Sequence, residues 1–504
     1  MVRVRFIFWS STAYERCCGK PNSALERLGD GRACDEPLEA PVQAQSTLQV
    51  ESHSIDFVPL TERYGTPLRL FTIWLSINLS IVCAAVGTLG PAAGLSLSWT
   101  ILGVAVGNAL GTLIMAAHSA QGPNLGIPQM IQSRAQFGVL GAALPLVAVV
   151  ITYILYTAAD GLLVEGSMRD LFSMSNNTAL ALFGLVTLII AYIGYELIHR
   201  MGAVLAVLSA LLFAAATYLY ITRPAGVAPV EHLAPPHFTR SAFVLMITQA
   251  AAWSLSFGPY VADYSRYLPA SVRPSTTFWC TGLGCFLGST LIMAFGAYIA
   301  SIAPALGADP GSAISNIFGR WRALAQLLVI LGVLQGNVMN LYSAYMSTVT
   351  IYSGVKSMQR VGRLTKILLM AVLIIAATAI SIWAQNDFQT YFADILSMMI
   401  YLLVPWSAIN LADYYLVRHG HYVIADMFRT DGQYKAVRWD TIGVYLLGIA
   451  CQAPFMSLSF YSGPVDKWLG ADVAWLPGLL IPTVVYVARE RSLLAGATLA
   501  QSRP

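Results

Sequence analysis

The sequence has few charged residues: Asp, Glu, Lys and Arg make up 11% of its 504 residues, whereas hydrophobic residues make up 57%. A typical soluble protein has about 25% charged residues. With so little charge the chain cannot cover a water-facing surface, which excludes a soluble globular protein and favours the lipid bilayer as its apolar solvent. The net charge of +4 comes without any long run of Lys and Arg, so we expect no nucleic-acid partner.

The sequence also lacks the motifs of common enzymes and metal sites. Its seven cysteines show no metal-ligand spacing, and four of them lie within apolar stretches, where they fit as small buried residues. There is no HExxH or GxSxG motif, and no repeated pore-loop signature of a channel. We therefore expect neither catalytic residues nor a metal or cofactor. His118, alone at the end of an apolar stretch, indicates an interface anchor.

Long apolar stretches alternate with short polar links from Leu68 onward, and a helix needs about 20 residues to cross the hydrocarbon core. The stretches predict twelve membrane helices, at about 69–90, 98–118, 138–165, 178–198, 202–222, 241–262, 277–302, 322–352, 366–385, 389–416, 439–460 and 473–489. Residues 1–66 are polar and without sustained periodicity, which predicts a mostly disordered cytoplasmic tail. A membrane domain over 67–490 and a short C-terminal tail over 491–504 complete the predicted organisation.

The placement of Lys and Arg predicts the orientation, because cytoplasmic segments of membrane proteins are enriched in both residues. With both termini in the cytoplasm, 23 of the 29 Lys and Arg residues lie on the cytoplasmic side. The same sign holds when the N-terminal tail is left out. We therefore expect a multi-pass protein of the cell membrane with an even number of helices.

Two of the apolar stretches carry helix-breaking residues at similar places. The first contains the polar run Trp74–Ser80 and then Gly87–Pro91, and the sixth contains Gly258-Pro259. Proline removes a backbone donor and clashes with the preceding turn. Unwound backbone at membrane depth is tolerated only where protein or a water-filled cavity satisfies it, and breaks five helices apart are typical of inverted repeats around a midplane site. Packing kinks are the alternative.

Several motifs connect the chain to a family. They are Glu62-Arg63-Tyr64-Gly65-Thr66-Pro67 before the first stretch, Gly122-Pro123-Asn124-Leu125-Gly126-Ile127-Pro128-Gln129-Met130 after the second, Ser256-Phe257-Gly258-Pro259-Tyr260 in the sixth and Asn410-Leu411-Ala412-Asp413-Tyr414-Tyr415 in the tenth. On these motifs the chain resembles the nucleobase–cation symporter family of purine–cytosine, uracil, allantoin and hydantoin permeases, over about residues 52–490.

The resemblance implies an all-α, LeuT-type architecture. Two inverted repeats of five helices, here 69–222 and 241–416, would be followed by two extra helices within 439–489. It also implies a secondary active symporter that imports a nucleobase or a related planar heterocycle by alternating access. A carrier of the same fold for an amino acid or a vitamin-like heterocycle is the alternative, and a membrane enzyme is disfavoured. The oligomeric state stays open, and a monomer is compatible with the sequence.

The family holds its substrate ring between aromatic side chains of spans three and six, while polar side chains of spans one, three and eight bond to the ring edges. Carried onto this sequence, the expected substrate-binding residues are Asn78; Tyr153, Tyr156 and Asp160; Trp253, Ser254, Phe257 and Gly258; Gln335, Asn337 and Asn340. The family often has a tryptophan in the place of Tyr156 and an amide near Asp160.

The coupling cation is the point at which this sequence departs from sodium-coupled members of the family. Those members place Ser or Thr hydroxyls of span eight around the ion, whereas Gln335 and Gly336 stand there in this chain. An ionisable residue within a membrane span costs about 2.5–3.5 kcal/mol to insert and is therefore expected to serve a function. Asp160 would accept donor groups of the substrate or carry a coupling proton. The sequence favours a proton over sodium, with the Gln335 carbonyl as the ligand in the sodium alternative.

Overall fold

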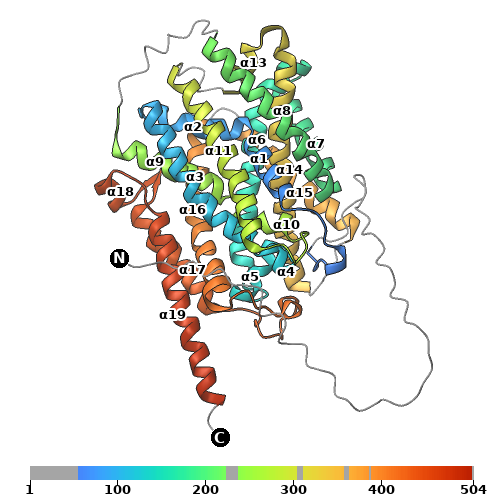
Figure 1. Ribbon diagram of the computed structural model, residues 1–504, viewed down its shortest axis with the longest axis vertical. Coiled ribbons are helices and arrows are strands. Elements are labelled where there is room, and N and C mark those ends of the chain that lie inside the picture. The colour runs from blue at the N-terminus through green and yellow to red at the C-terminus, as the bar shows by residue number, and fades with distance from the viewer. Residues whose placement is uncertain (1–54, 223–236, 303–309, 357–361, 385–387, 502–504) are drawn as a thin grey trace, which may run out of the picture. The chain divides into compact units, whose positions relative to one another are not determined.

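The computed structural model describes residues 55–222, 237–302, 310–356, 362–384 and 388–501, and these residues are almost entirely helical (Figure 1). The first half of the chain contains η2 (Leu60–Glu62), α1 (Leu68–Asn78), α2 (Ile81–Ala92), α3 (Leu97–Ser119), α4 (Gly122–Leu125), α5 (Gln129–Phe137), α6 (Ala143–Phe172), α7 (Asn176–Ile193) and α8 (Tyr195–Thr222).

The second half continues with helices of similar length. They are α9 (Arg240–Leu255), η4 (Gly258–Tyr260), α10 (Val261–Ser265), α11 (Pro274–Ile302), α13 (Pro310–Ile317), η5 (Gly319–Trp321), α14 (Arg322–Lys356), α15 (Arg363–Ala384), α16 (Phe388–Ala412), η6 (Asp413–Val417), η7 (Ile424–Phe428), α17 (Trp439–Gln452), η8 (Ala453–Phe455), α18 (Pro464–Leu469) and α19 (Trp475–Gln501). The strands β1 (Ser457–Leu458) and β2 (Tyr461–Ser462) pair as an antiparallel hairpin, with Ser457 opposite Ser462.

Most of the predicted spans are present as helices long and apolar enough to cross a membrane. The described part of the chain has nine such helices, and α1 with α2 forms a tenth span that is bent by 57°. Of the two predicted extra helices, α17 has only 14 residues, and neither it nor α19 is among these ten. The helical, multi-pass architecture is confirmed, and the count of twelve stays a prediction.

Some predicted boundaries are wrong. The fourth and fifth spans separate at Gly194, whose φ of 95° ends α7, and not at 199–201. Helix α17 ends at Gln452, where the hairpin follows, and α19 continues to Gln501 through most of the predicted C-terminal tail. Residues 55–66, assigned above to the N-terminal tail, pack on the helices, since Ile55 and Val58 are fully buried. The rest of that tail lies outside the described residues.

The packing of the helices follows an internal two-fold pattern. In the first predicted repeat the spans are α1–α2, α3, α6, α7 and α8, and in the second they are α9–α10, α11, α14, α15 and α16. Helix α3 packs along α9, just as its counterpart α11 packs along α1 and α2. Likewise α7 packs on α14 as α15 packs on α6, and α8 packs on α1 as α16 packs on α9. Exchanging the two repeats leaves these contacts unchanged, which is the mark of an internal structural repeat.

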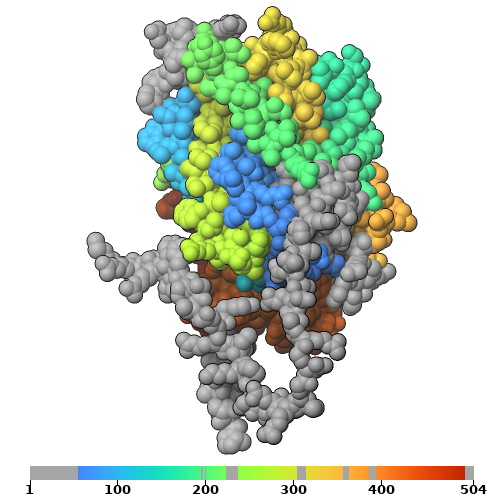
Figure 2. All heavy atoms as spheres, turned by 45° about the vertical axis from the view of Figure 1, so that its right-hand side comes forward, coloured from blue at the N-terminus to red at the C-terminus, as the bar shows by residue number. Residues whose placement is uncertain are grey.

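One of these contacts lies on the face shown in Figure 2. There the blue N-terminal part of the described chain, which contains α1, lies between the yellow-green α11 and the green α8. The first span is therefore enclosed by helices of both repeats.

Glycines bring the backbones together in two equivalent interfaces. A Cβ on Gly107 of α3 would lie 2.3 Å from the carbonyl oxygen of Ile247 in α9, and one on Gly296 of α11 would lie 1.9 Å from that of Ala84 in α2. Small residues are the usual means of close helix association in membranes, where lipid supplies no hydrophobic driving force. Helices α1, α2, α3, α9 and α11 thus form one closely packed group, which we call the glycine-packed group.

The two predicted helix interruptions are present, but they differ in extent. Helix α1 ends at Asn78, and Leu79 and Ser80 leave the helical conformation before α2 begins. The Gly87–Pro91 stretch lies within α2 and is not the break. In the sixth span α9 ends at Leu255, and the chain changes to the 3-10 helix η4 around Gly258-Pro259 without a sharp bend.

Candidate functional site

A small cavity, of about 20 Å³, lies beside both interruptions. It is enclosed by four parts of the structure: the α1–α2 break, α6, the end of α9 and α14. Its lining residues are Ile77, Ser80, Val82, Tyr156, Asp160, Trp253, Ser256, Phe257, Gly332, Val333, Gly336 and Asn340. Irregular backbone beside a cavity between repeats is where transporters of this architecture place their sites.

Aromatic rings form one wall of the cavity. The rings of Tyr156 and Trp253 have centroids 6.2 Å apart and an interplanar angle of 83°, and Phe257 stands edge-on to Trp253 at 5.6 Å. This is the edge-to-face arrangement that aromatic pairs prefer. Two rings that sandwich a planar ligand would instead lie parallel to each other. Their planes would be about 7 Å apart, because each ring would lie about 3.5 Å from the ligand. Tyr156 and Trp253 therefore meet at the cavity, and one of them must rotate to sandwich a ring.

Trp253 is held in place by Asn78. The Trp253 indole Nε1 donates to Asn78 Oδ1 at 2.6 Å, and Asn78 Nδ2 donates to the Trp74 carbonyl at 2.6 Å. Asn78 is fully buried and is not part of the cavity lining. Asn78 thus orients Trp253 in the aromatic wall and does not itself line the cavity.

A carboxyl–amide pair forms the polar wall. Asn340 Nδ2 donates to Asp160 Oδ2 at 3.2 Å, and both side chains are buried, with exposed fractions of 8% and 3%. No side chain or backbone group of the described residues donates to the other oxygen, Asp160 Oδ1. The cavity lining contains no Lys, Arg or His, so no cation from the lining compensates a charge on Asp160.

Six of the predicted site residues lie outside the lining. Besides Asn78, the Tyr153 hydroxyl donates to the Ser256 carbonyl at 2.9 Å, and Ser254 Oγ donates to Asn108 at 3.0 Å. Gln335 Nε2 donates to Ser76 Oγ at 2.8 Å, next to the α1–α2 break. The remaining two are Asn337, which donates to Thr187 Oγ1 at 3.0 Å, and Gly258, whose Cβ position faces His118 and Trp406.

Several lining residues were not predicted, although their spacing along the helix marks them. Gly332, Gly336 and Asn340 are four residues apart along α14, so they share one helix face. Asn337 follows Gly336 directly, so its side chain leaves the helix in another direction, toward Thr187. Ser80 begins α2 directly after the break, a position that the polar run in the first span already marked.

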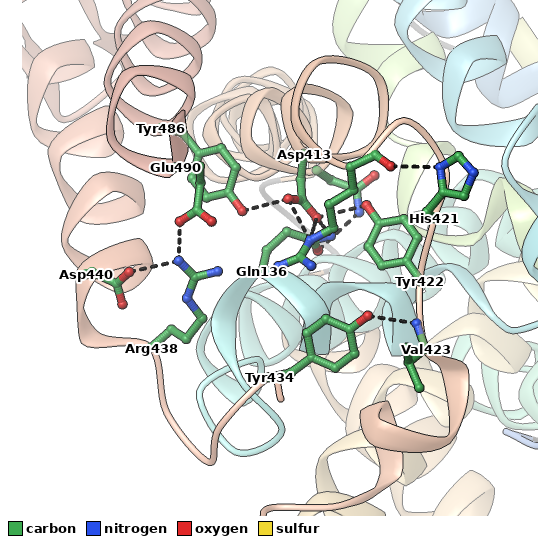
Figure 3. A network of polar contacts seen from close by, with 12 residues as sticks. Gln136, Asp413, His421, Tyr422, Val423, Tyr434, Arg438, Asp440, Tyr486 and Glu490 are labelled. Atoms are coloured by element: carbon green, nitrogen blue, oxygen red, sulfur yellow. Dashed lines mark hydrogen bonds and ion pairs between the residues drawn. The ribbon is translucent and has the colours of Figure 1, made fainter. Parts of the chain in front are cut away.

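A second polar cluster lies around Asp413, at the end of α16 (Figure 3). This buried carboxylate accepts side-chain hydrogen bonds of 2.7–3.2 Å from four residues: Gln136, Tyr422, Tyr486 and Arg418. The cluster joins α5, α16, α19 and the link after η6. It stabilises the ends of these helices and lies apart from the cavity lining.

The environment of His118 differs from the prediction. Its side chain is fully buried, its ring stacks on Trp406 with centroids 4.8 Å apart, and Nε2 lies 3.1 Å from Ser407 Oγ. The expectation of an interface anchor is therefore wrong, because α16 covers the end of α3.

Comparisons with known proteins agree with this architecture. The sequence profile of the family described as "Permease for cytosine/purines, uracil, thiamine, allantoin" matches residues 57–478. The chain belongs to this family. It is therefore a multi-pass membrane transporter and not an enzyme.

Individual relatives cover nearly the whole permease. A protein of Bacillus subtilis named putative purine-cytosine permease YxlA is 37% identical over 440 residues, which are 87% of this chain and 95% of the relative. The purine-cytosine permease fcyB of Emericella nidulans is 24% identical, over 87% of this chain and 88% of the relative.

Among solved structures, the nucleobase-cation-symport-1 family transporter Mhp1, in a closed conformation with bromovinylhydantoin bound, matches with a TM-score of 0.72. The identity is 18%, over 88% of this chain and 96% of Mhp1. The fold of this permease is thus the LeuT-type fold.

Proposed function

We propose that this permease imports a nucleobase or a related planar heterocycle by symport with a proton, through alternating access. The observation that carries the proposal is the cavity itself: ring-bearing side chains on one wall, a carboxyl–amide pair on another, and two helix interruptions beside it. Its relatives are named as purine-cytosine permeases, and Mhp1 was solved with a hydantoin.

The chemistry of the lining favours a heterocycle over an amino acid. An amino-acid carboxylate in this cavity would lie against the Asp160 carboxyl, and the lining offers no cation to separate the two charges. Two carboxylates in contact repel each other, which disfavours the ionised form of both. A neutral planar ring instead contacts Tyr156 and Trp253 with its faces, while its edge bonds to Asp160 and Asn340.

Proton coupling is favoured by the environment of Asp160. A buried carboxylate with no nearby cation is costly in a membrane, and a bound proton removes the charge. Sodium coupling is the alternative, and it would use Gln335, whose Oε1 has no hydrogen-bond partner among the described residues. The neighbouring Gly336 offers no side-chain oxygen to complete such a site.

Uptake into proteoliposomes tests this function. Accumulation of radiolabelled adenine and cytosine in sodium-free buffer, driven by an inward proton gradient and abolished by a protonophore, is the expected result. A competition panel of uracil, allantoin and leucine should show that the two heterocycles compete and that leucine does not. Uptake that requires sodium would reject the proton, and competition by leucine alone would reject the heterocycle.

The proposed setting is the cell membrane, with both termini in the cytoplasm. The distribution of Lys and Arg supports this orientation. Cysteine labelling in intact cells tests it: a cysteine introduced after Ser492 in α19 should be protected from an impermeant reagent, and labelling from outside would reverse the orientation.

A further inference from the structure

The cavity is smaller than a nucleobase in this state of the protein. Its volume of about 20 Å³ holds about one water molecule. A base can therefore enter or leave only when the glycine-packed group and the pair of helices α6 and α14 move apart. Bonds that connect these two groups oppose the movement, and the place of each bond shows which side of the cavity it holds closed.

Tyr153 of α6 makes such a bond to the interruption in the sixth span. Its hydroxyl donates to the Ser256 carbonyl at 2.9 Å, and Ser256 directly follows α9 of the glycine-packed group. The carbonyl lacks a donor from its own span, because Pro259 has no N–H and the N–H of Tyr260 donates to the Phe257 carbonyl at 3.2 Å. A buried carbonyl without a donor is costly. The Tyr153 hydroxyl thus replaces the missing helical donor.

This bond lies on one particular side of the cavity. Tyr153 comes seven residues before Asp160, which places it about 10 Å nearer to the start of α6. The start of α6 follows α5, and α5 packs on α10 at the end of the sixth span. The start of α1 lies there too, since the Tyr64 N–H before α1 donates to the Tyr267 carbonyl after α10 at 2.7 Å. The proposed orientation assigns this side to the cytoplasm.

Three buried aromatic rings lie on the same side, about one helical turn from the cavity. Trp74, Tyr153 and Tyr260 each stand three residues from a lining residue of their own span, and each is at most 1% exposed. The ring of Tyr260 contacts the other two, with centroids 5.9 Å from Trp74 and 5.1 Å from Tyr153. We call these three residues the aromatic layer. Because Tyr153 is its member from α6, separation of the two helix groups divides the layer.

Resting on the function and orientation proposed above, we propose that Tyr153 is a latch of the transport cycle. Its bond to the Ser256 carbonyl holds the aromatic layer closed on the cytoplasmic side, and the bond breaks when the two helix groups separate to release the base. Tyr153 lies outside the cavity lining and is thus a positioning residue. The bond from Gln335 to Ser76 also joins the two groups, so loss of the latch shifts the equilibrium without abolishing closure.

Tyr153→Phe tests the latch, and Tyr260→Phe is its matched control. Both variants lose one hydroxyl of the aromatic layer and keep the ring, but the Tyr260 hydroxyl has no hydrogen-bond partner among the described residues. In Tyr153→Phe the Ser256 carbonyl is unpaired while the layer is closed, whereas water reaches it in the open state. The equilibrium should therefore shift about tenfold toward the state open to the cytoplasm, which corresponds to about 1.4 kcal/mol.

A cysteine on α14 reports this opening. Ser343 is 1% exposed and lies three residues beyond Asn340, toward the cytoplasmic end of α14, so Ser343→Cys becomes accessible when the groups separate. In inside-out vesicles, an impermeant maleimide should label this cysteine about tenfold faster when Tyr153→Phe is added, because labelling follows the population of the open state. With Tyr260→Phe the rate should stay within about twofold. The chain without Ser343→Cys gives the labelling of the native cysteines.

A second reporter distinguishes the latch from a general loosening of the protein. Val333 lines the cavity and lies seven residues before Asn340, toward the opposite end of α14. In right-side-out vesicles, Val333→Cys should be labelled no faster when Tyr153→Phe is added, and faster labelling of both reporters would overturn the latch.

The latch and the proposed function can fail separately, because labelling needs no substrate. Equal labelling of Ser343→Cys in the Tyr153→Phe and Tyr260→Phe backgrounds would refute the latch and leave the proposed function standing. Absence of base uptake by the wild type, with labelling that still depends on Tyr153, would refute the function and support the latch.

Discussion

The hydrogen bond between Trp253 and Asn78 gives the most direct test of how the aromatic wall is positioned. Both side chains are buried, and the 2.6 Å bond is the one that the indole N–H makes. Asn78→Ala leaves this donor unpaired, which costs about 1–3 kcal/mol. If that cost falls on the substrate complex, the Kd of the transported base rises about 5- to 150-fold, at 1.4 kcal/mol per tenfold.

A double-mutant cycle separates this bond from the size of the ring. Trp253→Phe keeps an aromatic ring but leaves Asn78 Oδ1 without its donor. When both changes are combined, neither the indole donor nor the Asn78 acceptor remains, and removing both partners is far less costly than removing one. We expect the double variant to bind the base more tightly than the sum of the single effects predicts, with a coupling energy of about 1–3 kcal/mol.

The assay is the Kd of the base and the apparent melting temperature of the purified protein, measured for the four members of the cycle. The loss of ring area in Trp253→Phe occurs on both sides of the cycle and cancels. Additive effects, with a coupling energy below about 0.5 kcal/mol, would show that Asn78 does not hold Trp253.

Three further predictions concern single positions. Gly107→Ala places a Cβ 2.3 Å from a backbone oxygen of α9 and should lower stability by about 1–3 kcal/mol in thermal unfolding. The control Gly166→Ala, with nothing within 4 Å of the new Cβ, should be neutral or slightly stabilising. Equal effects of the two substitutions would contradict the close approach of α3 and α9. Tyr156→Ala should weaken base binding by about 1–3 kcal/mol and Tyr156→Phe far less, and an equal loss in both would assign the effect to the hydroxyl. Asp413→Asn breaks a buried ion pair with Arg418 and should cost about 3–5 kcal/mol. Asp431→Asn, in an exposed pair, should leave the melting temperature nearly unchanged. Similar melting temperatures for the two variants would contradict this.

The fold was predictable because it depends mainly on the length and spacing of apolar runs along the sequence. Apolar runs of membrane length must become helices, since backbone groups in lipid can be satisfied only within the segment. The errors occur where this rule does not decide. The division between α7 and α8 depends on the backbone conformation of Gly194 and not on polarity, and the short α17 depends on the turn and hairpin that follow Gln452.

The site was predictable only in part, because it depends on which way each helix faces. Tyr156, Asp160, Trp253, Phe257 and Asn340 were expected and do line the cavity. The composition of each span showed which residues were polar or aromatic, but the rotation of a helix is set by its packing.

Gln335 illustrates the limit of the sequence argument. It is a buried amide in the same helix as Asn340, yet its side chain bonds to Ser76. Only the position of α1 against α14 decides between a ligand-facing and a helix-bridging role, and the spacing of α14 residues does not contain that position.

The placement of the site connects substrate binding to movement. Trp253, Phe257 and Ser80 come from the glycine-packed group, whose backbones approach too closely for its helices to shift separately. Tyr156, Asp160 and Asn340 come from α6 and α14, which pack on each other and on α7 and α15.

Every contact that a bound ring makes with both walls therefore crosses from one helix group to the other. A ring that touches both walls binds most strongly when the two groups lie at one particular separation. A ligand shifts a conformational equilibrium only by its difference in affinity for the two states. Because a bound ring bridges the two groups, its affinity would differ between their two separations, and binding would shift the equilibrium between them.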